Sequence, residues 1–419
     1  MKRPFRTAVC VLLLLALGLT SCHRDEEFVP RRPRPETADQ TLLFYLTGTD
    51  LSAYFRQNID AMMSAIDRDI LYDSRVLVFV EGQKNRPTIL ELNYAPNNAN
   101  YDPAQPLSHA HAAIDTLYRW EAADFNSMER STIAGTLRRM AEAAPAHRYG
   151  VIFGGHGLGW LPAESTAPYA VHDSAADPWT PLPDALPTRW LGDPRKRASI
   201  PDLGEALRET GLRFEYLIFD ACFMSSVEAL YELRESCRYI VASPCEIMAS
   251  GFAYDEILPD LLCDGGRSYD LPRVCRDYYD YYANRAQTPS GCIALTDTSE
   301  LEALAAIVRE IETRAARPCD PAPLQTYEGL ADHVFFDLGD YIAAVCDDAA
   351  LLAEFERQMA RTFPEESRRH TPSFYSAYGR GSDPQGMHPI RSYSGVTTSA
   401  PCARFAAEWQ QTAWYRTTH

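Results

Sequence analysis

The sequence lacks several features that would place it in common functional classes. None of its eleven cysteines are in Cys-x-x-Cys spacing, which argues against a zinc site. It has no internal repeat, no coiled-coil heptads and no obvious linker. Positive charge is in deficit: the formal net charge is −17 at pH 7. An acidic body argues against nucleic acid and anionic membrane surfaces as partners, and it mildly favours basic substrates.

Long hydrophobic runs are also missing, except for one at the amino terminus. Basic residues precede Val9–Leu19, a run too short to span a bilayer, so we expect residues 1–21 to be a secretory signal. The small residues before Cys22 resemble a bacterial lipobox, in which cleavage precedes a cysteine that then carries lipid. An ordinary signal peptide with a chance cysteine is the alternative. Residues 22–40 are Pro-rich and charged, and should form a flexible tether.

These features predict a protein of the bacterial cell envelope. Its anchor to a membrane would be a lipid on Cys22, and acidic residues just after this cysteine suggest exposure on the outer surface. The rest of the chain has no segment apolar enough to span a membrane.

Apolar runs and helical patterns alternate along the remaining chain. The runs are apolar on both faces, which is typical of strands covered by helices on each side. They are Leu42–Leu46, Arg75–Val80, Gly150–Phe153, Tyr216–Phe219, Tyr239–Ala242 and Ile293–Leu295. The helical patterns are Ser52–Ile70, Ser131–Ala144, Ile200–Glu209, Ser225–Glu235 and Ser299–Arg317. This order predicts an α/β fold with a mostly parallel central sheet over 41–320, and a carboxyl-terminal region, 321–419, packed on it.

Two of these runs end in residues that can perform catalysis. Tyr216–Phe219 is followed by Asp-Ala-Cys, which places Cys222 at the end of a strand and next to a helix amino terminus that favours the thiolate. Gly150–Phe153 is followed by Gly-Gly-His-Gly, which brings His156 to the same edge of the sheet. The pair fits a cysteine nucleophile with a histidine base. The alternatives are a buried structural thiol and a histidine that caps a turn.

The same blocks carry a family resemblance. The block Asp-Ala-Cys-Phe-Met-Ser-Ser-Val-Glu, preceded by His-Gly-Leu-Gly-Trp-Leu-Pro, resembles the clostripain family of cysteine endopeptidases, which belongs to a caspase-like group. The resemblance extends from Thr41 to Tyr415. It implies a caspase-like α/β/α sandwich, protein or peptide substrates, and hydrolysis after Arg or Lys through an acyl-enzyme.

The chain departs from the family pattern before the histidine. Gly154 and Gly155 stand where the family has a bulky or polar pair. Because of this departure, the alternative function is that of a binding or adhesion module: a lipoprotein with a peptidase fold that is catalytically inactive. A sugar- or polymer-binding envelope protein is a third class, supported only by the lipobox.

Four further residues are candidates for the substrate cleft. The N–H groups of Gly157 and Cys222 lie beside the reacting carbonyl and are expected oxyanion donors. Asp220 faces the same side of its strand as the thiol, and the resemblance implies that it forms the floor of a pocket for Arg or Lys. Ser243 and Glu246 follow the next strand, where the family lines its cleft. The alternative role of Asp220, Ser243 and Glu246 is to order a turn instead of contacting substrate.

The insertion between the histidine and cysteine blocks, 161–199, is unusually long for a loop and contains Arg195-Lys196-Arg197. Related enzymes are often made as precursors that are cut after a basic residue in this interval. An intact loop could therefore cover the cleft, with its arginines competing for the Asp220 pocket, and a cut is expected near Arg197. A solvated basic turn is the alternative. Cys245 is a rival nucleophile that lacks the Asp-Ala context.

No cofactor is expected. Some family members require calcium, and four aspartates of the insertion could ligate a hard cation, but no spacing specifies a metal site. These are Asp173, Asp177, Asp184 and Asp193. Disulfide pairing among the remaining cysteines cannot be read from the sequence.

Overall fold

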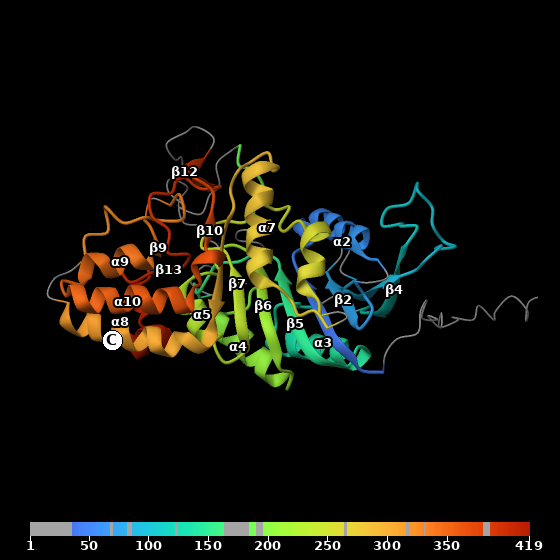
Figure 1. Ribbon diagram of the computed structural model, residues 1–419, viewed down its shortest axis with the longest axis horizontal. Helices are drawn as coiled ribbons and strands as arrows, with labels where there is room; N and C mark the ends of the chain where they lie inside the picture. The colour runs from blue at the N-terminus through green and yellow to red at the C-terminus, as the bar shows by residue number, and fades with distance from the viewer. Residues whose placement is uncertain are drawn as a thin grey trace, which may run out of the picture. The chain divides into compact units, whose positions relative to one another are not determined.

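A computed structural model describes most of the chain from residue 36 onward. The described residues are 36–67, 70–81, 86–121, 125–162, 184–189, 196–263, 266–315, 319–330, 332–379 and 386–419. Within these ranges nine strands form one sheet in the order β10-β8-β7-β6-β5-β1-β2-β3-β4 (Figure 1). Their bounds are β1 Ala38–Leu46, β2 Ser74–Val80, β3 Thr88–Tyr94, β4 Ala112–Arg119, β5 Ala146–Gly154, β6 Phe214–Asp220, β7 Cys237–Ala242, β8 Cys292–Asp297 and β10 Arg369–His370.

The centre of the sheet is parallel, as the sequence predicts. Strand β1 pairs in parallel with β2 and β5, and β6 pairs in parallel with β5 and β7. The predicted pairing of Gly150–Phe153 with Tyr216–Phe219 is confirmed by the register of β5 on β6. The outer strands β3, β4, β8 and β10 are antiparallel to their neighbours. Antiparallel edges were not expected from the sequence.

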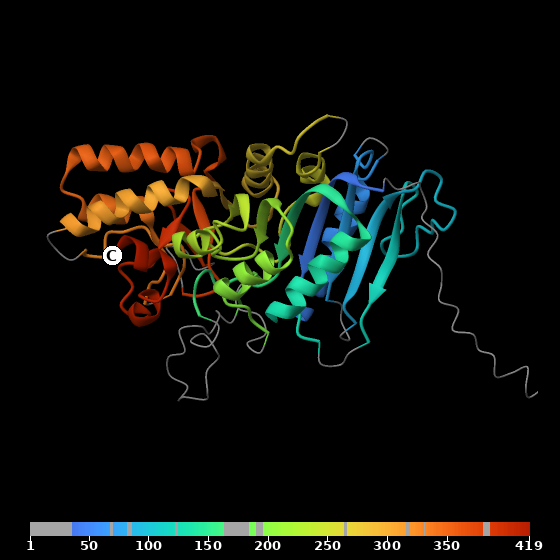
Figure 2. The same ribbon diagram turned by 90° about the horizontal axis from the view of Figure 1, so that it is seen from below.

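Helices cover both faces of this sheet (Figures 1 and 2). Helices α2, α6 and α7 lie on one face, and α3, α4 and α5 lie on the other. Their bounds are α2 Ser52–Ala65, α3 Arg130–Ala143, α4 Ile200–Glu209, α5 Val227–Glu232, α6 Tyr254–Ile257 and α7 Leu271–Asn284. This arrangement is the α/β/α sandwich expected from the resemblance.

The carboxyl-terminal region packs beyond β8. Its main helices are α9 Leu338–Val345, α10 Ala349–Thr362, α11 Ala406–Trp409 and α12 Ala413–Thr418, and α9, α10 and α12 contact the preceding helix α8 Leu301–Arg314. Short strands make two small ladders: β9 Phe336–Asp337 with β13 Thr397–Thr398, and β11 Ser373–Tyr375 with β12 Met387–Pro389. The Thr397 N–H donates to the carbonyl of Ser225 at 2.9 Å, so this region holds the loop that follows the cysteine.

Some helix ends are set by capping residues in the local sequence, and others are set by contacts with distant segments. Helix α4 has the predicted bounds, because Ser199 accepts from the Asp202 N–H as an N-cap and Pro201 lies in the first turn. The helix predicted over Ser225–Glu235 is shorter, since the preceding residues pair with β13 instead. Strand β1 begins at Ala38, so the sheet includes the last residues of the expected tether.

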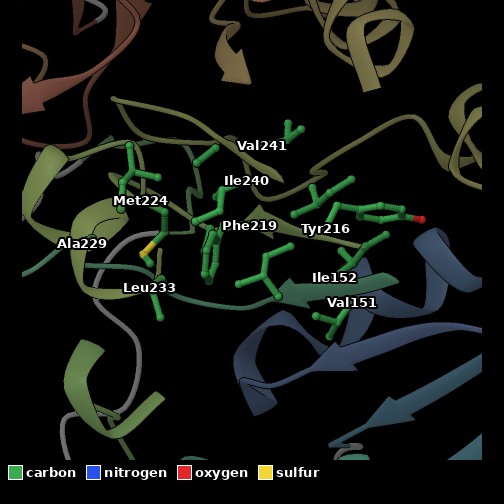
Figure 3. Packing of buried hydrophobic residues seen from close by; sticks show 14 of the residues in the cluster. Val151, Ile152, Tyr216, Phe219, Met224, Ala229, Leu233, Ile240 and Val241 are labelled. Carbon is green, nitrogen blue, oxygen red and sulfur yellow. The ribbon is translucent and has the colours of Figure 1, made fainter. Parts of the chain in front are cut away.

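The hydrophobic core supports the carboxyl ends of the central strands. Figure 3 shows side chains of β5, β6 and β7 packed together with residues of the loop after β6 and of α5. Val151, Ile152, Ile240 and Val241 are completely buried. Burying one such side chain contributes about 1.5–3 kcal/mol, so this core holds the strand ends in fixed positions.

Candidate active site

The carboxyl ends of β1, β5 and β6 meet at one edge of the sheet. Gly154, the last residue of β5, lies opposite Asp220, the last residue of β6, and beside the end of β1. His156 follows β5 and Cys222 follows β6. The backbone of Gly157 approaches the backbone of Cys222 so closely that a Cβ at 157 would overlap it. The sheet therefore brings the two predicted catalytic residues next to each other.

Close contacts with the end of β1 explain why two glycines precede the histidine. A Cβ on Gly154 would lie 2.6 Å from Cδ2 of Leu46, and a Cβ on Gly155 would lie 2.8 Å from Oγ1 of Thr47. Both distances are shorter than real Cβ contacts, so the end of β1 leaves no space for larger side chains here. The departure from the family pattern fits the close packing of β5 on β1 in this chain.

The His156 ring is held by a carboxylate that the sequence analysis missed. Nε2 of His156 lies 2.9 Å from Oδ2 of Asp50, and the hydrogen bond from the ring lowers the pKa of Asp50. Asp50 lies in the turn between β1 and α2, at the third strand end of this edge. Nδ1 of the ring is buried and has no hydrogen-bond partner among the described residues. It is free to accept a proton.

The thiol of Cys222 is buried and faces the segment after β7. Its Sγ accepts from the Ile247 N–H at 3.2 Å and lies 3.7 Å from the Ile247 carbonyl oxygen. Burial, followed by the charge of Glu246, raises the pKa of Cys222 well above its ordinary value. Helix α5 begins only at Val227. The expectation of a helix-stabilised thiolate is therefore wrong for this conformation, and no hydrogen bond joins the thiol to His156 among the described residues.

Asp220 lies at the bottom of a closed pocket that an arginine of the insertion fills. The Asp220 and Arg189 side chains are both completely buried, with Nη1 of Arg189 2.7 Å from Oδ2 of Asp220. The Tyr254 hydroxyl also donates to this oxygen, at 2.8 Å. Nη2 of Arg189 donates to Asn58 Oδ1 at 2.9 Å and to the Ala249 carbonyl at 3.1 Å. Burial raises the pKa of Asp220, and the charge of Arg189 opposes that shift.

The backbone of this arginine is held as firmly as its side chain. Its N–H donates to the Ile247 carbonyl at 2.8 Å, and the Ala249 N–H donates to the Pro187 carbonyl at 3.0 Å. Residues 187–189 thus pair antiparallel with 247–249. The carbonyl oxygen of Arg189 accepts from the Gly157 N–H at 3.0 Å, and this N–H is an expected oxyanion donor. Peptides that bind along the edge of a strand adopt the same arrangement: the backbone is extended and a side chain is inserted into a pocket.

A glycine that the sequence analysis did not single out shapes the same pocket. Gly251 has a φ of +70°, and a Cβ there would overlap the Arg189 guanidinium and lie 2.5 Å from Oδ2 of Asp220. Glycine adopts this backbone conformation without strain, and its lack of a side chain leaves space for the Arg189 guanidinium.

Ser243 and Glu246 have different positions relative to the cleft. Glu246 is buried and accepts from the Thr188 hydroxyl at 2.7 Å, so it contacts the insertion one residue before Arg189. Its other oxygen accepts from the Ser376 hydroxyl at 2.6 Å, and burial raises the pKa of Glu246 to about 7. Ser243 is buried and bonds the backbone of Cys245, so it orders the turn.

Cys245, the rival nucleophile, has no hydrogen bond to His156 among the described residues. Cys245 is buried, and its sulfur lies near the Ser243 hydroxyl and the carbonyl of Glu246, at 3.5 Å from each. All nine cysteines in the described ranges are free, and six of them are buried.

Several predicted features lie outside the described residues. These are the signal segment, Cys22, Arg195 and three of the four aspartates suggested for calcium. No cluster of three or more His, Cys, Asp or Glu side chains suited to a metal ion occurs in the described part of the chain, where Asp184 is the fourth aspartate. In that same part, no helix has the length and apolar character needed to cross a bilayer.

Comparisons with known proteins agree with this geometry. The family model of the clostripain family, peptidase C11, matches residues 45–332. A secreted C11 cysteine protease from Bacteroides thetaiotaomicron, called iotapain, is 31% identical; the match covers 92% of this chain and 100% of that one, with a TM-score of 0.76. No curated protein gave a match.

Two further solved structures are similar. An inactive zymogen C11 protease from Parabacteroides distasonis is 26% identical over 92% of this chain and 100% of that one, with a TM-score of 0.71. A secreted C11 cysteine protease from Bacteroides thetaiotaomicron, in complex with an irreversible peptide inhibitor, is 22% identical over 91% of this chain and 99% of that one, again with a TM-score of 0.71, and supports the fold. By the family model and the fold together, the chain belongs to the clostripain family and is a cysteine-type peptidase.

Proposed function

We propose that this peptidase is an endopeptidase that cleaves after Arg or Lys, with Cys222 as nucleophile and His156 as general base and acid. One observation carries the proposal: Arg189 places its guanidinium on Asp220 and its carbonyl oxygen on the Gly157 N–H. A substrate arginine needs these same two contacts at the bond to be cut. A buried carboxylate selects a cation, because an uncharged side chain would leave it unpaired.

The first half of the reaction forms an acyl-enzyme. His156 takes the proton of the Cys222 thiol, and Sγ then attacks the carbonyl carbon of the substrate residue in the Asp220 pocket. The oxyanion is held by the N–H groups of Gly157 and Cys222. When the C–N bond breaks, protonated His156 gives its proton to the leaving amine. Asp50 orients the ring and supports its positive charge during these steps.

The second half releases the acid product. Water enters where the amine left, His156 removes its proton, and the resulting hydroxide attacks the thioester carbonyl. The C–S bond then breaks, and the proton on His156 returns to the sulfur of Cys222. The thiol must leave its contact with Ile247 before the first attack, since Sγ has no hydrogen bond to the histidine in the intact chain.

In our proposal the intact chain is a precursor whose own Arg189 occupies the Asp220 pocket. Arg189 closes the pocket, so no other arginine can enter until it leaves. The bond presented for cutting is then Arg189–Trp190, which replaces the expected cut near Arg197. Arg197 instead lines a hollow on the other side of His156. A structural neighbour described as an inactive zymogen supports this view.

The proposal is tested by labelling with a chloromethyl ketone probe that carries arginine. Processed wild-type protein is expected to bind the probe covalently, and Cys222→Ala is expected not to. A matched probe with aspartate in place of arginine is the specificity control and should label neither protein. Equal labelling of wild type and Cys222→Ala would contradict the assignment. An inactive binding module would label with neither probe, even after the loop is cut by an added protease.

We also propose that the peptidase is tethered to the cell envelope by lipid on Cys22. The lipobox-like residues before this cysteine support the proposal. Growth of a producing bacterium with a clickable palmitate analogue tests it. Wild type should incorporate the label and Cys22→Ser should not, and incorporation by both would contradict the assignment of this cysteine.

A further inference from the structure

A hollow lies beside His156, on the side away from the Asp220 pocket. Its empty volume is about 1050 Å³, a figure that includes open space at its mouth. His156, Gly157 and Ala221 border it. Its other walls are mostly apolar and come from β1, β5, β6, α3, α4 and the loop after β5; they include Tyr45, Ile133, Phe153, Leu161, Leu203 and Phe219.

One buried carboxylate interrupts these apolar walls. Glu81 directly follows β2, and its side chain is 2% exposed. The Ser127 hydroxyl donates to Oε2 of Glu81 at 2.7 Å, and the ammonium group of Lys196 pairs with Oε1. A carboxylate removed from water is costly unless a cation and hydrogen bonds satisfy it. The hollow is therefore built to hold a positive group at Glu81.

The hollow lies on the leaving-group side of the reacting bond. Successive residues of a strand point to opposite faces of the sheet. Accordingly, Asp220 contacts Tyr254 on the α6 face, whereas Phe219 lines the hollow on the face of α3 and α4. The insertion binds the Asp220 pocket through Arg189, and after that residue it reaches the hollow, where Lys196 lies. His156, which protonates the leaving amine in the proposed mechanism, lines the hollow, and the N–H of the next residue, Gly157, donates to the Arg189 carbonyl.

We propose that this hollow is a second substrate pocket, which binds a Lys or Arg side chain that follows the scissile bond and pairs it with Glu81. The inference rests on the proposed function. In the intact chain two basic side chains of one loop pair with the carboxylates of these two pockets: Arg189 with Asp220, and Lys196 with Glu81. Lys196 is one of three lysines in the chain, and it is the only lysine within the described residues.

The chemistry of the walls favours a long basic side chain over other types. Apolar walls bind the methylene stem of Lys or Arg, while Glu81 binds the charged end. A neutral side chain would leave Glu81 without a cation, and an acidic one would repel it. The enzyme should therefore prefer substrates that are basic on both sides of the cut.

The experiment uses processed full-length enzyme and peptides with a fixed arginine before the scissile bond. In each peptide, one of the four positions after the bond is either Lys or Ala, and kcat/KM is measured for every pair. We expect the Lys/Ala ratio to exceed about tenfold at one position, the size of effect that a buried charge pair gives. Glu81→Gln should bring this ratio close to one, and Lys196→Ala should lower KM for the preferred peptide because it empties the pocket.

Two controls keep the result interpretable. Glu302→Gln breaks an exposed ion pair with Arg234, remote from the cleft, and should leave the ratio unchanged. A coumarin amide of arginine has no residue after the scissile bond, so its hydrolysis by wild type tests the proposed function alone. Hydrolysis of this amide with no Lys preference at any position overturns the second pocket. The second pocket is also overturned if Glu81→Gln lowers kcat/KM equally for all peptides, because an equal loss indicates a structural effect. No hydrolysis of the amide overturns the proposed function and this inference with it.

Discussion

At the scale of single residues, our proposal assigns to Asp50 the orientation of the His156 ring. It pairs with Nε2 of His156, so Nδ1 remains available for the thiol proton. The carboxylate is 62% exposed, and solvent therefore weakens its electrostatic effect. We expect Asp50→Asn to lower kcat on an arginine coumarin amide by about tenfold and to leave KM unchanged, since orientation of the base affects the chemical step.

A matched control exists elsewhere on the surface. Asp60 pairs with Nε2 of His109 at 2.9 Å, in the same geometry but away from the cleft. Asp60→Asn should therefore have wild-type kinetics. If both variants lose the same activity, or if Asp50→Asn changes KM alone, Asp50 does not position the ring.

Glu246 gives a prediction on pH and stability. Its pKa is raised from 4.5 to about 7 by burial, so the folded chain holds this proton more tightly than the unfolded chain does. Glu246 therefore contributes stability that is fully present below about pH 4.5 and is lost as the pH rises to about 7, about 3 kcal/mol in total. Urea unfolding of Cys222→Ala between pH 4.5 and 8 measures this trend. Adding Glu246→Gln should remove this contribution, and an unchanged trend would contradict the assignment.

At the scale of elements, the segment around Arg189 decides whether the cleft is open. It pairs with 247–249 and ends with its carbonyl on the oxyanion donor, so the bond after Arg189 is the one presented to the thiol. Purified wild-type chain should convert to two fragments, the second beginning at Trp190, as read by denaturing gel and mass spectrometry. Arg189→Ala and Cys222→Ala should stay intact, whereas Arg197→Ala should be cut normally. A new amino terminus after Arg197 would contradict this assignment.

The same scale shows what the sequence could and could not predict. Strands β1, β2, β5, β6, β7 and β8 were predicted because each contains a continuous apolar run, and their order placed His156 and Cys222 at one edge. The antiparallel β3 and β4 were missed, since polar residues such as Glu91 and Asp115 interrupt them. Helix α7 was missed as well, in a stretch rich in tyrosine and charge.

The partners of the site residues depend on distant segments. Asp50 and Glu81 are single carboxylates after strands, and nothing in their local sequence distinguishes them from the other acidic residues. Arg189 and Asp220 are 31 positions apart, and no periodic pattern around Arg189 indicates this contact. Local patterns thus predicted that His156 and Cys222 lie at one edge of the sheet, while the ion pairs of Arg189 and Lys196 required the three-dimensional structure.

At the scale of the whole molecule, a cut after Arg189 divides the central sheet between two neighbouring strands. The insertion joins β5 to α4, so the first fragment keeps β5, β1, β2, β3 and β4, and the second keeps β6, β7, β8 and β10. The border is the parallel pairing of β5 with β6, where Val151, Ile152, Leu217 and Ile218 are buried. Separation would expose this core and a row of unpaired backbone groups.

We therefore expect the two fragments to remain one particle after processing. Gel filtration in native buffer should give a single peak at the position of the uncut 47.0 kDa chain, and the same sample in urea should give two. The cut also frees Arg189 to leave the Asp220 pocket, so the Cys222 thiol should react with iodoacetamide faster in the processed particle than in the wild-type chain before processing. Fragments that separate in native buffer would mean that the covalent loop, and not the β5–β6 border, holds the two halves of the sheet together.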